Sequence, residues 1–397
     1  MRTLRIAHLS DTHLGYRSLA KHDPVSGRNQ RSIDIERAFA WAIDDILARD
    51  IDLVIHSGDL FHHSRPVFPA IGAAIRQLRK LERKDIPVVL IAGNHDTPRL
   101  RMTGSVYSLL ESALPDVRFF GGYDDHQFAL EQLDVVLTVT PHGRLTNPEP
   151  ASVFPVRDRR NVLVTHGLVP HMDLPYSLRE PGEEEISEFM LDQAFDYIAL
   201  GHYHQHGQPR PNAWYAGSTE RIGWGDVETE PGYLIVELGS VGSAPAVERV
   251  QVPIARPMHA HTVPERIVAS QDGVRIAEHV LDWLQKLDSP EAMTRILMPD
   301  APRPVRRHAE VLVKEDADGY VWSVQIAGRS LESSAIAEHH PDLPSLSLLE
   351  QFAAFVTAEQ DAGTYDPIFA VNFAIAGRQE LETAMATIES QLTSEES

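Results

Sequence analysis

Five short apolar runs in the first half of the chain each end in a cluster of metal-binding residue types. Each run is rich in Ile, Val and Leu and stops at a small or polar residue, as buried strands do. Ligands bind beyond the carboxyl ends of the strands in open α/β sheets, so five such clusters are expected to converge on one point. The five runs are Leu4–Leu9, Asp52–His56, Pro87–Ala92, Asn161–Thr165 and Asp196–Leu200.

The clusters supply seven side chains with nitrogen or oxygen donors and no thiolate. They are Asp11, His13, Asp59, Asn94, His166, His202 and His204. Such a set suits manganese, iron or zinc and does not build a sulfur-ligated centre. Two divalent cations beside two carboxylates leave a net charge of about +2, which attracts a phosphodiester. Paired metals lower the pKa of bound water toward about 7 and hold the attacking and departing oxygens, so the pattern indicates a two-metal phosphoesterase.

Two further histidines are candidates for handling the departing group and the phosphate. A leaving alkoxide needs a proton, and His95, between Asn94 and Asp96, is the candidate general acid. Positioned proton transfer of this kind is typically worth about 100- to 10,000-fold in rate. Asp96 is expected to orient the His95 ring. His62, three residues beyond Asp59, is expected to face the same pocket and hold the phosphate.

A lone histidine is more often a surface or core residue than a ligand, and the chain has 20 of them. His8 and His56 lie within the apolar runs and are assigned no chemistry. His63 and His206 flank motif residues, where packing or hydrogen bonding is favoured over ligation. A single Gly-Asn-His-Asp or Gly-His-x-His string could be an ordinary turn, but five clusters in one order favour a metal site.

These motifs resemble those of the calcineurin-like metallophosphoesterases. The segments Asp11–Tyr16, Gly58–His62 and Tyr215–Arg221 are similar to the bacterial SbcD nuclease and its archaeal and eukaryotic counterpart, the meiotic-recombination-eleven DNA repair nuclease. The protein serine/threonine phosphatases fit worse, since that branch has Asp-Arg-Gly after the second motif and Gly-Asn-His-Glu at the third. The resemblance covers roughly Arg2 to Val252.

The resemblance implies a role for each motif residue, and no ligand position is missing. One metal would be held by Asp11, His13, Asp59 and His204, and the other by Asp59, Asn94, His166 and His202. Asp59 would bridge the two metals, His95 would be the catalytic histidine, and His62 would steer the scissile phosphate.

The resemblance further implies a manganese-dependent DNA nuclease acting in double-strand break repair. Such enzymes are 3′-to-5′ exonucleases on double-stranded ends and endonucleases on single strands or hairpins. The implied partners are DNA ends, an SbcC-type coiled-coil ABC ATPase and a second copy of the chain in a homodimer. An alternative is a metallophosphoesterase acting on a small phosphodiester such as a cyclic nucleotide. A scaffold with a vestigial metal site is disfavoured because every expected ligand is present.

The formal net charge of −21 argues against strong intrinsic DNA binding, because nonspecific affinity for DNA comes mainly from Lys and Arg. The acidity is uneven: from Pro341 onward, Arg378 is the only basic residue against ten acidic ones. The chain has no cysteine, no apolar signal region at its start and no run long enough to span a bilayer. We therefore expect a cytoplasmic protein without a disulfide framework.

The predicted fold class is α/β, a two-sheet sandwich flanked by helices, over residues 1–252. Helices are expected at Ser32–Arg49, Ala70–Lys84, Gly104–Leu114 and Glu184–Ala194. Four segments with short β patterns are expected to form a second sheet packed on the first. These are Phe128–Leu130, Val135–Val139, Tyr233–Leu238 and Val247–Val252.

Two further regions are expected beyond Val252. Residues 253–337 are predicted to form a small α+β domain with a helix at Asp272–Leu287 and strands at Val305–Lys314 and Tyr320–Ile326. The resemblance implies that this domain caps the site and helps to place DNA. Residues 338–397 are predicted to be an acidic helical tail whose apolar positions dock either on the chain's own domain or, as we favour, on a partner. The resemblance implies that this partner is the ATPase. Its helices are expected at Ser347–Glu359 and Gln379–Leu392, with a strand-like run at Pro367–Ala376.

Overall fold

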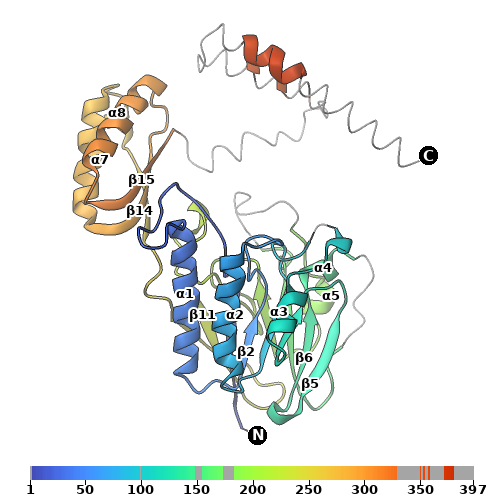
Figure 1. The fold of residues 1–397 in the computed structure, drawn as a ribbon. Helices are drawn as coiled ribbons and strands as arrows, with labels where there is room; N and C mark the ends of the chain where they lie inside the picture. Colours follow the sequence, from blue (N-terminus) through green and yellow to red (C-terminus); the bar gives the residue numbers. More distant parts are fainter. Residues whose placement is uncertain are drawn as a thin grey trace. The chain divides into compact units, whose positions relative to one another are not determined.

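The computed structural model describes residues 2–98, 100–147, 154–172 and 183–328, and within the tail residues 349, 352–353, 356–357 and 371–379. The chain forms two compact units (Figure 1). The first contains Met1–Ala260, Asp288–Thr294 and Gly319–Val324, and the second contains His261–Leu287, Arg295–Asp318 and the described residues from Gln325 onward. Within the described part of the chain, no helix is long and apolar enough to cross a membrane.

The first six-stranded sheet has the order β12-β11-β1-β2-β3-β4. Strands β1 to β4 are parallel, whereas β11 is antiparallel to β1 and β12 is antiparallel to β11. Their bounds are β1 (Leu4–Leu9), β2 (Leu53–His56), β3 (Val88–Ile91), β4 (Val117–Phe120), β11 (Gly232–Leu238) and β12 (Ala246–Gln251).

The second six-stranded sheet has the order β5-β6-β7-β8-β10-β9, and its central strands β6, β7, β8 and β10 are parallel. Its strands are β5 (His126–Leu130), β6 (Val135–Thr140), β7 (Arg160–His166), β8 (Tyr197–Gly201), β9 (Gly207–Arg210) and β10 (Ala213–Tyr215). The two-sheet α/β architecture is confirmed. The membership of the sheets was predicted wrongly, because β11 and β12 extend the first sheet and the motif strands β7 and β8 belong to the second.

Side chains alternate between the two faces of the first sheet. On β1, Leu4 and Ile6 point into the core between the sheets, while Ala7 and Leu9 join a second core under the helices. This helical layer contains α1 (Gln30–Leu47), α2 (Phe68–Glu82) and α3 (Tyr107–Ala113), and Figure 1 shows α1 and α2 side by side. Because the central strands are covered on both faces, their sequences are nearly continuously apolar.

The helix expected at Glu184–Ala194 is reduced to α5 (Glu188–Leu191). Leu168 accepts a backbone hydrogen bond from Ile186 and donates one to Glu184, so the start of the expected helix is extended instead. The short helix α4 (His142–Leu145) follows β6. Met190 and Leu191 of α5 pack on the outer face of the second sheet, against Ile198 of β8.

Strands and helices alternate after β12, and the three strands form a sheet of order β13-β14-β15. The elements are β13 (Met258–Thr262), α6 (Glu265–Val268), α7 (Gly273–Leu287), β14 (Ser289–Leu297), α8 (Arg303–Asp316) and β15 (Val321–Ala327). The helix at α7 and the strand at β15 are confirmed. The predicted strand Val305–Lys314 is wrong, since α8 occupies it, so this region is α/β and not α+β. Ala309 and Val313, four residues apart, are buried together as on one helix face.

The helices expected at Ser347–Glu359 and Gln379–Leu392 lie mostly outside the described residues; residues 349, 352–353, 356–357 and 379 are helical. The strand-like run Pro367–Ala376 is wrong where the structure describes it, because residues 371–379 are helical. An alternating pattern predicts a strand only where a neighbouring strand takes its backbone hydrogen bonds, and a helix satisfies these groups locally.

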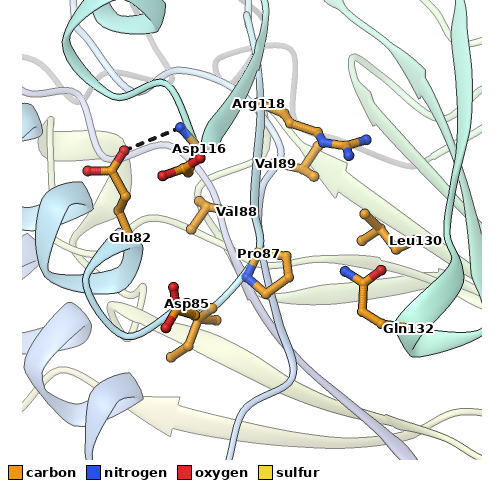
Figure 2. Close-up of a pocket in the computed structure, with 10 residues that line it drawn as sticks. Glu82, Asp85, Pro87, Val88, Val89, Asp116, Arg118, Leu130 and Gln132 are labelled. Atoms are coloured by element: carbon orange, nitrogen blue, oxygen red, sulfur yellow. Dashed lines mark hydrogen bonds between the residues drawn. The ribbon is translucent and has the colours of Figure 1, made fainter.

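The amino ends of β3 and β4 border a cavity of about 250 Å³ (Figure 2). Its lining includes three carboxylates, from Glu82, Asp85 and Asp116, and the guanidinium group of Arg118. The sequence motifs follow the opposite, carboxyl ends of the strands.

Candidate metal centre

All seven predicted donors lie in the first unit, at the carboxyl ends of five parallel strands. Asp11 and His13 follow β1, Asp59 follows β2, and Asn94 follows β3. His166 ends β7, and His202 and His204 follow β8. The first sheet therefore supplies four donors and the second sheet three, so the centre lies where the two sheets meet.

The donor atoms form two overlapping groups. Those of Asp11, His13 and His204 lie within 4.8 Å of one another, as do those of Asp11, Asp59 and His166. The Nε2 atoms of His13 and His204 are 3.0 Å apart. Asp59 Oδ2 lies 3.8 Å from His13 Nε2 and 3.4 Å from His166 Nε2. Asp11 therefore belongs to both groups, and the Asp59 carboxylate lies between His13 and His166.

Asn94 closes the second group. Its Oδ1 lies 2.8 Å from His166 Nε2 and 3.2 Å from His202 Nδ1. The backbone N–H of His202 donates to both carboxylate oxygens of Asp11, at 3.2 and 3.1 Å, which ties the loop after β8 to the loop after β1. His202 Nε2 faces Glu183 Oε1 at 3.3 Å.

Outer hydrogen bonds set which nitrogen of each ring faces the centre. His166 Nδ1 donates to the Ser57 carbonyl oxygen at 2.9 Å, and His204 Nδ1 donates to Asp226 Oδ2 at 3.0 Å. With the proton on Nδ1, both rings present the Nε2 lone pair inward, as metal-binding histidines do. Sequence analysis assigned no role to Glu183, Asp226 or Ser57, although Gly225-Asp226 belongs to the region of resemblance.

The donor set fits divalent cations. The Nδ1–H of neutral His166 donates to the Ser57 carbonyl oxygen, so Nε2 carries a lone pair and is an acceptor. This Nε2 lies 2.8 Å from Asn94 Oδ1, which is also an acceptor. Two acceptors at this distance repel unless a cation or a proton lies with them. Burial alone would lower the pKa of His166, but the Asp59 carboxylate raises it to about 9. The pocket therefore attracts positive charge, and these nitrogen and oxygen ligands suit manganese, iron or zinc.

The backbone around the donors adopts conformations that side chains rarely tolerate. Asp11, His13 and Asp59 are left-handed, with φ of 50°, 50° and 56°, and His202 has φ of 111°. Such residues persist when the surrounding structure holds them, and they cluster at functional sites. Gly58 has φ of 108°, and a Cβ there would lie 2.2 Å from His166 Nδ1.

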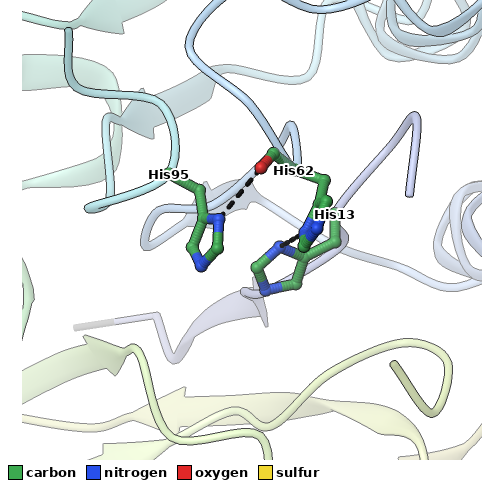
Figure 3. Close-up of side chains that lie close together, drawn as sticks. All are labelled: His13, His62 and His95. Atoms are coloured by element: carbon green, nitrogen blue, oxygen red, sulfur yellow. Dashed lines mark hydrogen bonds between the residues drawn. The ribbon is translucent and has the colours of Figure 1, made fainter. Parts of the chain in front are cut away.

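His62 and His95 lie beside His13 (Figure 3). His62 Nδ1 is 3.3 Å from His13 Nδ1, and His95 Nδ1 donates to the His62 carbonyl oxygen at 2.9 Å. The rings of His62 and His95 stack, with centroids 4.9 Å apart. The His95 backbone N–H donates to Asp59 Oδ1 at 2.9 Å. His62 also lines a cavity of about 230 Å³ together with Arg17 and His63.

The predicted role of Asp96 in orienting the His95 ring stays a prediction, and the structure shows a second task for this residue. Its carboxylate is fully buried and accepts hydrogen bonds from the backbone N–H groups of Leu60 and Phe61, each at 2.9 Å. The Tyr107 hydroxyl donates to the same carboxylate at 2.9 Å. Burial and the nearby Asp59 carboxylate raise the pKa of Asp96 to about 7. Asp96 therefore holds the loop after β2 in place.

Comparison with known proteins places these motifs in a family. The sequence profile of the calcineurin-like phosphoesterases matches residues 4–206. The DNA double-strand break repair protein Mre11 of Methanococcus maripaludis is 31% identical over 235 residues, covering 57% of this chain and 59% of the relative. That of Haloferax volcanii is 33% identical over 240 residues, covering 59% of this chain and 49% of the relative. The chain thus matches about half the length of these curated relatives.

Proposed function

Because the chain belongs to the calcineurin-like phosphoesterase family and is related to the Mre11 proteins, we propose that this metallophosphoesterase is a DNA nuclease. It would hydrolyse phosphodiester bonds at DNA ends with two divalent cations, most suitably manganese. The proposal extends to 3′-to-5′ cutting of double-stranded ends, cutting of single strands or hairpins, and a role in double-strand break repair.

One observation supports this proposal above all. Seven nitrogen and oxygen donors come from five strand ends on two sheets. Asn94 and the histidines meet in pairs at 2.8–3.2 Å, and the Asp11 and Asp59 carboxylates lie within 4.8 Å of His166. Bound there, two divalent cations would supply an activated water and stabilise charge on the attacking and departing oxygens. Asp11, His13, Asp59 and His204 would hold one cation, and Asp59, Asn94, His166 and His202 the other.

His95 is the proposed general acid. Its Nδ1–H donates a hydrogen bond to the His62 carbonyl oxygen, and Nε2 would exchange a proton with the departing oxygen. The stacking of His95 on His62 and the bond from its backbone to Asp59 fix the ring beside the donors. His62, which lines the adjoining cavity, would hold a non-bridging oxygen of the phosphate.

The proposal also includes the partners of the nuclease. A homodimer would present two centres to DNA ends, and an SbcC-type coiled-coil ABC ATPase would bind the tail at residues 338–397. Residues 253–337 would help to position DNA. The net charge of −21 is consistent with weak intrinsic affinity for DNA. A partner would then supply much of the affinity of the complex for DNA.

The test compares wild type with His95→Asn on two substrates in the presence of manganese. End-labelled hairpin DNA and bis-p-nitrophenyl phosphate are incubated with each protein, and bound manganese is measured on the same samples. We expect wild type to cut both substrates. His95→Asn should lose about 100- to 10,000-fold in rate on DNA while its bound manganese is unchanged.

His171→Asn is the matched control, because the His171 side chain is 89% exposed. It should retain wild-type rates on both substrates. Cleavage of the small ester without cleavage of DNA would contradict the nuclease proposal and support a small-phosphodiester substrate.

A further inference from the structure

A second polar cluster lies in the core between the two sheets, and no step of the proposed reaction uses it. It consists of His8 on β1, Ser57 after β2 and Tyr197 on β8, all fully buried. Their neighbours on the same face include Ile6 and Ile55, which are apolar core residues. Burying a polar group without a hydrogen-bond partner is destabilising, so the partners of these three side chains are informative.

Both ring nitrogens of His8 are bonded. Nδ1 lies 2.8 Å from the Tyr197 hydroxyl, and Nε2 lies 2.8 Å from Ser57 Oγ. Burial raises the pKa of Tyr197 well above its usual value, so the phenol keeps its proton. Burial, with smaller effects from His56 and His206, lowers the pKa of His8 to about 3, so its ring is neutral near pH 7.

The direction of these bonds follows from the proton count. Among the described residues, His8 is the one hydrogen-bond partner of the Tyr197 hydroxyl, which therefore donates to Nδ1. A neutral imidazole has a single N–H, so Nε2 donates to Ser57 Oγ. The Ser57 hydroxyl can then donate to the Leu9 carbonyl oxygen at 3.5 Å.

Ser57 continues this chain of bonds to the metal centre. Its backbone N–H donates to the Leu9 carbonyl oxygen at 2.9 Å, and its own carbonyl oxygen accepts from His166 Nδ1 at 2.9 Å. The path runs from the second sheet at Tyr197 to the first sheet at His8 and Ser57, and returns to the second sheet at His166. This chain of hydrogen bonds therefore connects the two sheets that supply the donors.

We infer that Tyr197, His8 and Ser57 form a cross-sheet link that positions His166 against the donors of the first sheet and thereby sets the affinity for divalent cations. The inference rests on the proposed metal centre. Tyr197 and His8 are positioning residues, since they act on the centre through Ser57 and His166. Apolar side chains could fill this core in several orientations because they need no hydrogen bonds. A fully hydrogen-bonded polar chain instead holds its side chains in one orientation.

The test removes one hydroxyl group from each of two buried tyrosines in the full-length protein. Tyr197→Phe breaks the link at its far end, away from every donor. Tyr233→Phe is the matched control, because the Tyr233 hydroxyl donates to Asp45 Oδ2 at 2.5 Å on the outer, helix-covered face of the first sheet. Manganese binding is measured by titration calorimetry, and the Tm of each metal-free protein is measured in parallel.

We expect Tyr197→Phe to weaken manganese binding by at most about 10- to 100-fold, the usual effect of losing a direct outer partner of a metal-bound histidine, because Tyr197 reaches His166 only through His8 and Ser57. Tyr233→Phe should bind manganese as wild type does, even though both substitutions lower the Tm. Wild-type manganese affinity in Tyr197→Phe, or an equal loss in the two variants, would overturn the inference.

A double variant separates positioning from stability. In His8→Leu/Tyr197→Phe both members of the Tyr197–His8 pair are replaced, while the Ser57 hydroxyl keeps the Leu9 carbonyl oxygen as an acceptor. Replacing both members of a buried pair typically restores stability that a single replacement loses. We expect its Tm to recover relative to Tyr197→Phe while its manganese affinity stays low. Recovery of affinity together with Tm would contradict the inference. A wild-type protein that binds no manganese would overturn the proposed centre itself, which is a different outcome from normal binding by both wild type and Tyr197→Phe.

Discussion

The two ends of the parallel strands both present carboxylates and a cavity, yet they differ in how these groups are arranged. At the carboxyl ends, donors from five strand ends face one another. The Nδ1–H groups of His166 and His204 point outward, to Ser57 and Asp226. At the amino ends, Glu82 accepts from the backbone of Asp116, and the Arg118 guanidinium group lies over the Phe128 ring. Converging lone pairs, and not a cavity with charges, therefore distinguish a metal centre.

The largest expected effect contrasts one aspartate from each end. Asp59→Asn removes the carboxylate charge that lies between His13 and His166, whereas Asp85→Asn removes one at the amino-end cavity. Asp59→Asn should weaken cation binding, and bound metal ions contribute several kcal/mol to transition-state stabilisation. We therefore expect the variant to hydrolyse bis-p-nitrophenyl phosphate with manganese about 1,000-fold more slowly, or slower still. Asp85→Asn should hydrolyse it as wild type does. Equal rates in the two variants would erase the distinction between the ends.

A second contrast uses glycines. Gly58→Ala places a methyl group 2.2 Å from His166 Nδ1 at a φ of 108°, whereas Gly27→Ala meets nothing within 4 Å at a φ of 68°. Left-handed backbone costs about 1–2 kcal/mol for an alanine, and overpacking adds about 1–3 kcal/mol. Urea unfolding of the metal-free proteins should therefore show the larger loss for Gly58→Ala. A similar loss in both would mean that the loop after β2 yields easily.

Asp226→Asn tests the outward-facing bonds. The His204 contact and the backbone N–H groups of Ile222 and Gly223 lower the pKa of Asp226, although burial alone would raise it. The variant should bind manganese about 10- to 100-fold more weakly by calorimetry. Asp116→Asn, at the amino ends, serves as the control and should bind as wild type does. Unchanged affinity in Asp226→Asn would show that Asp226 does not support His204.

The smallest effect concerns pH. Burial lowers the pKa of His56 to about 3 from its ordinary value of 6.5. Between these values the unfolded chain binds the extra proton, so stability falls as the pH drops below 6.5, by at most about 1.4 kcal/mol per pH unit for this group. His56→Asn should show a shallower decline between pH 6.5 and 5 in urea unfolding. An unchanged slope would mean that His56 takes up its proton without unfolding.

The strand ends and their donors could be predicted from the sequence because both signals are local. A short apolar run ending in Asp, Asn or His needs no knowledge of its neighbours, as at Asp59 and His166. Sheet membership depends on pairing between distant strands, so β11 and β12 were assigned to the wrong sheet. The hydrogen bonds that the Asp96 carboxylate accepts were also not predicted, because its partners, Leu60, Phe61 and Tyr107, are distant in sequence.

Helix α8 shows a different limit. Its sequence contains Val-Leu-Val, which favours a strand, but the apolar positions that are buried lie four residues apart. Packing on the sheet decides between these periods, and the sequence window alone does not. The same reasoning applies to Glu183, whose contact with His202 is visible only once the chain is folded.

Anomalous diffraction from a manganese-soaked crystal of the full-length protein would locate the cations. We expect two manganese peaks on either side of Asp59, one beside His13 and His204 and the other beside Asn94, His166 and His202. A single peak, or peaks at the amino-end cavity in place of this centre, would contradict this expectation.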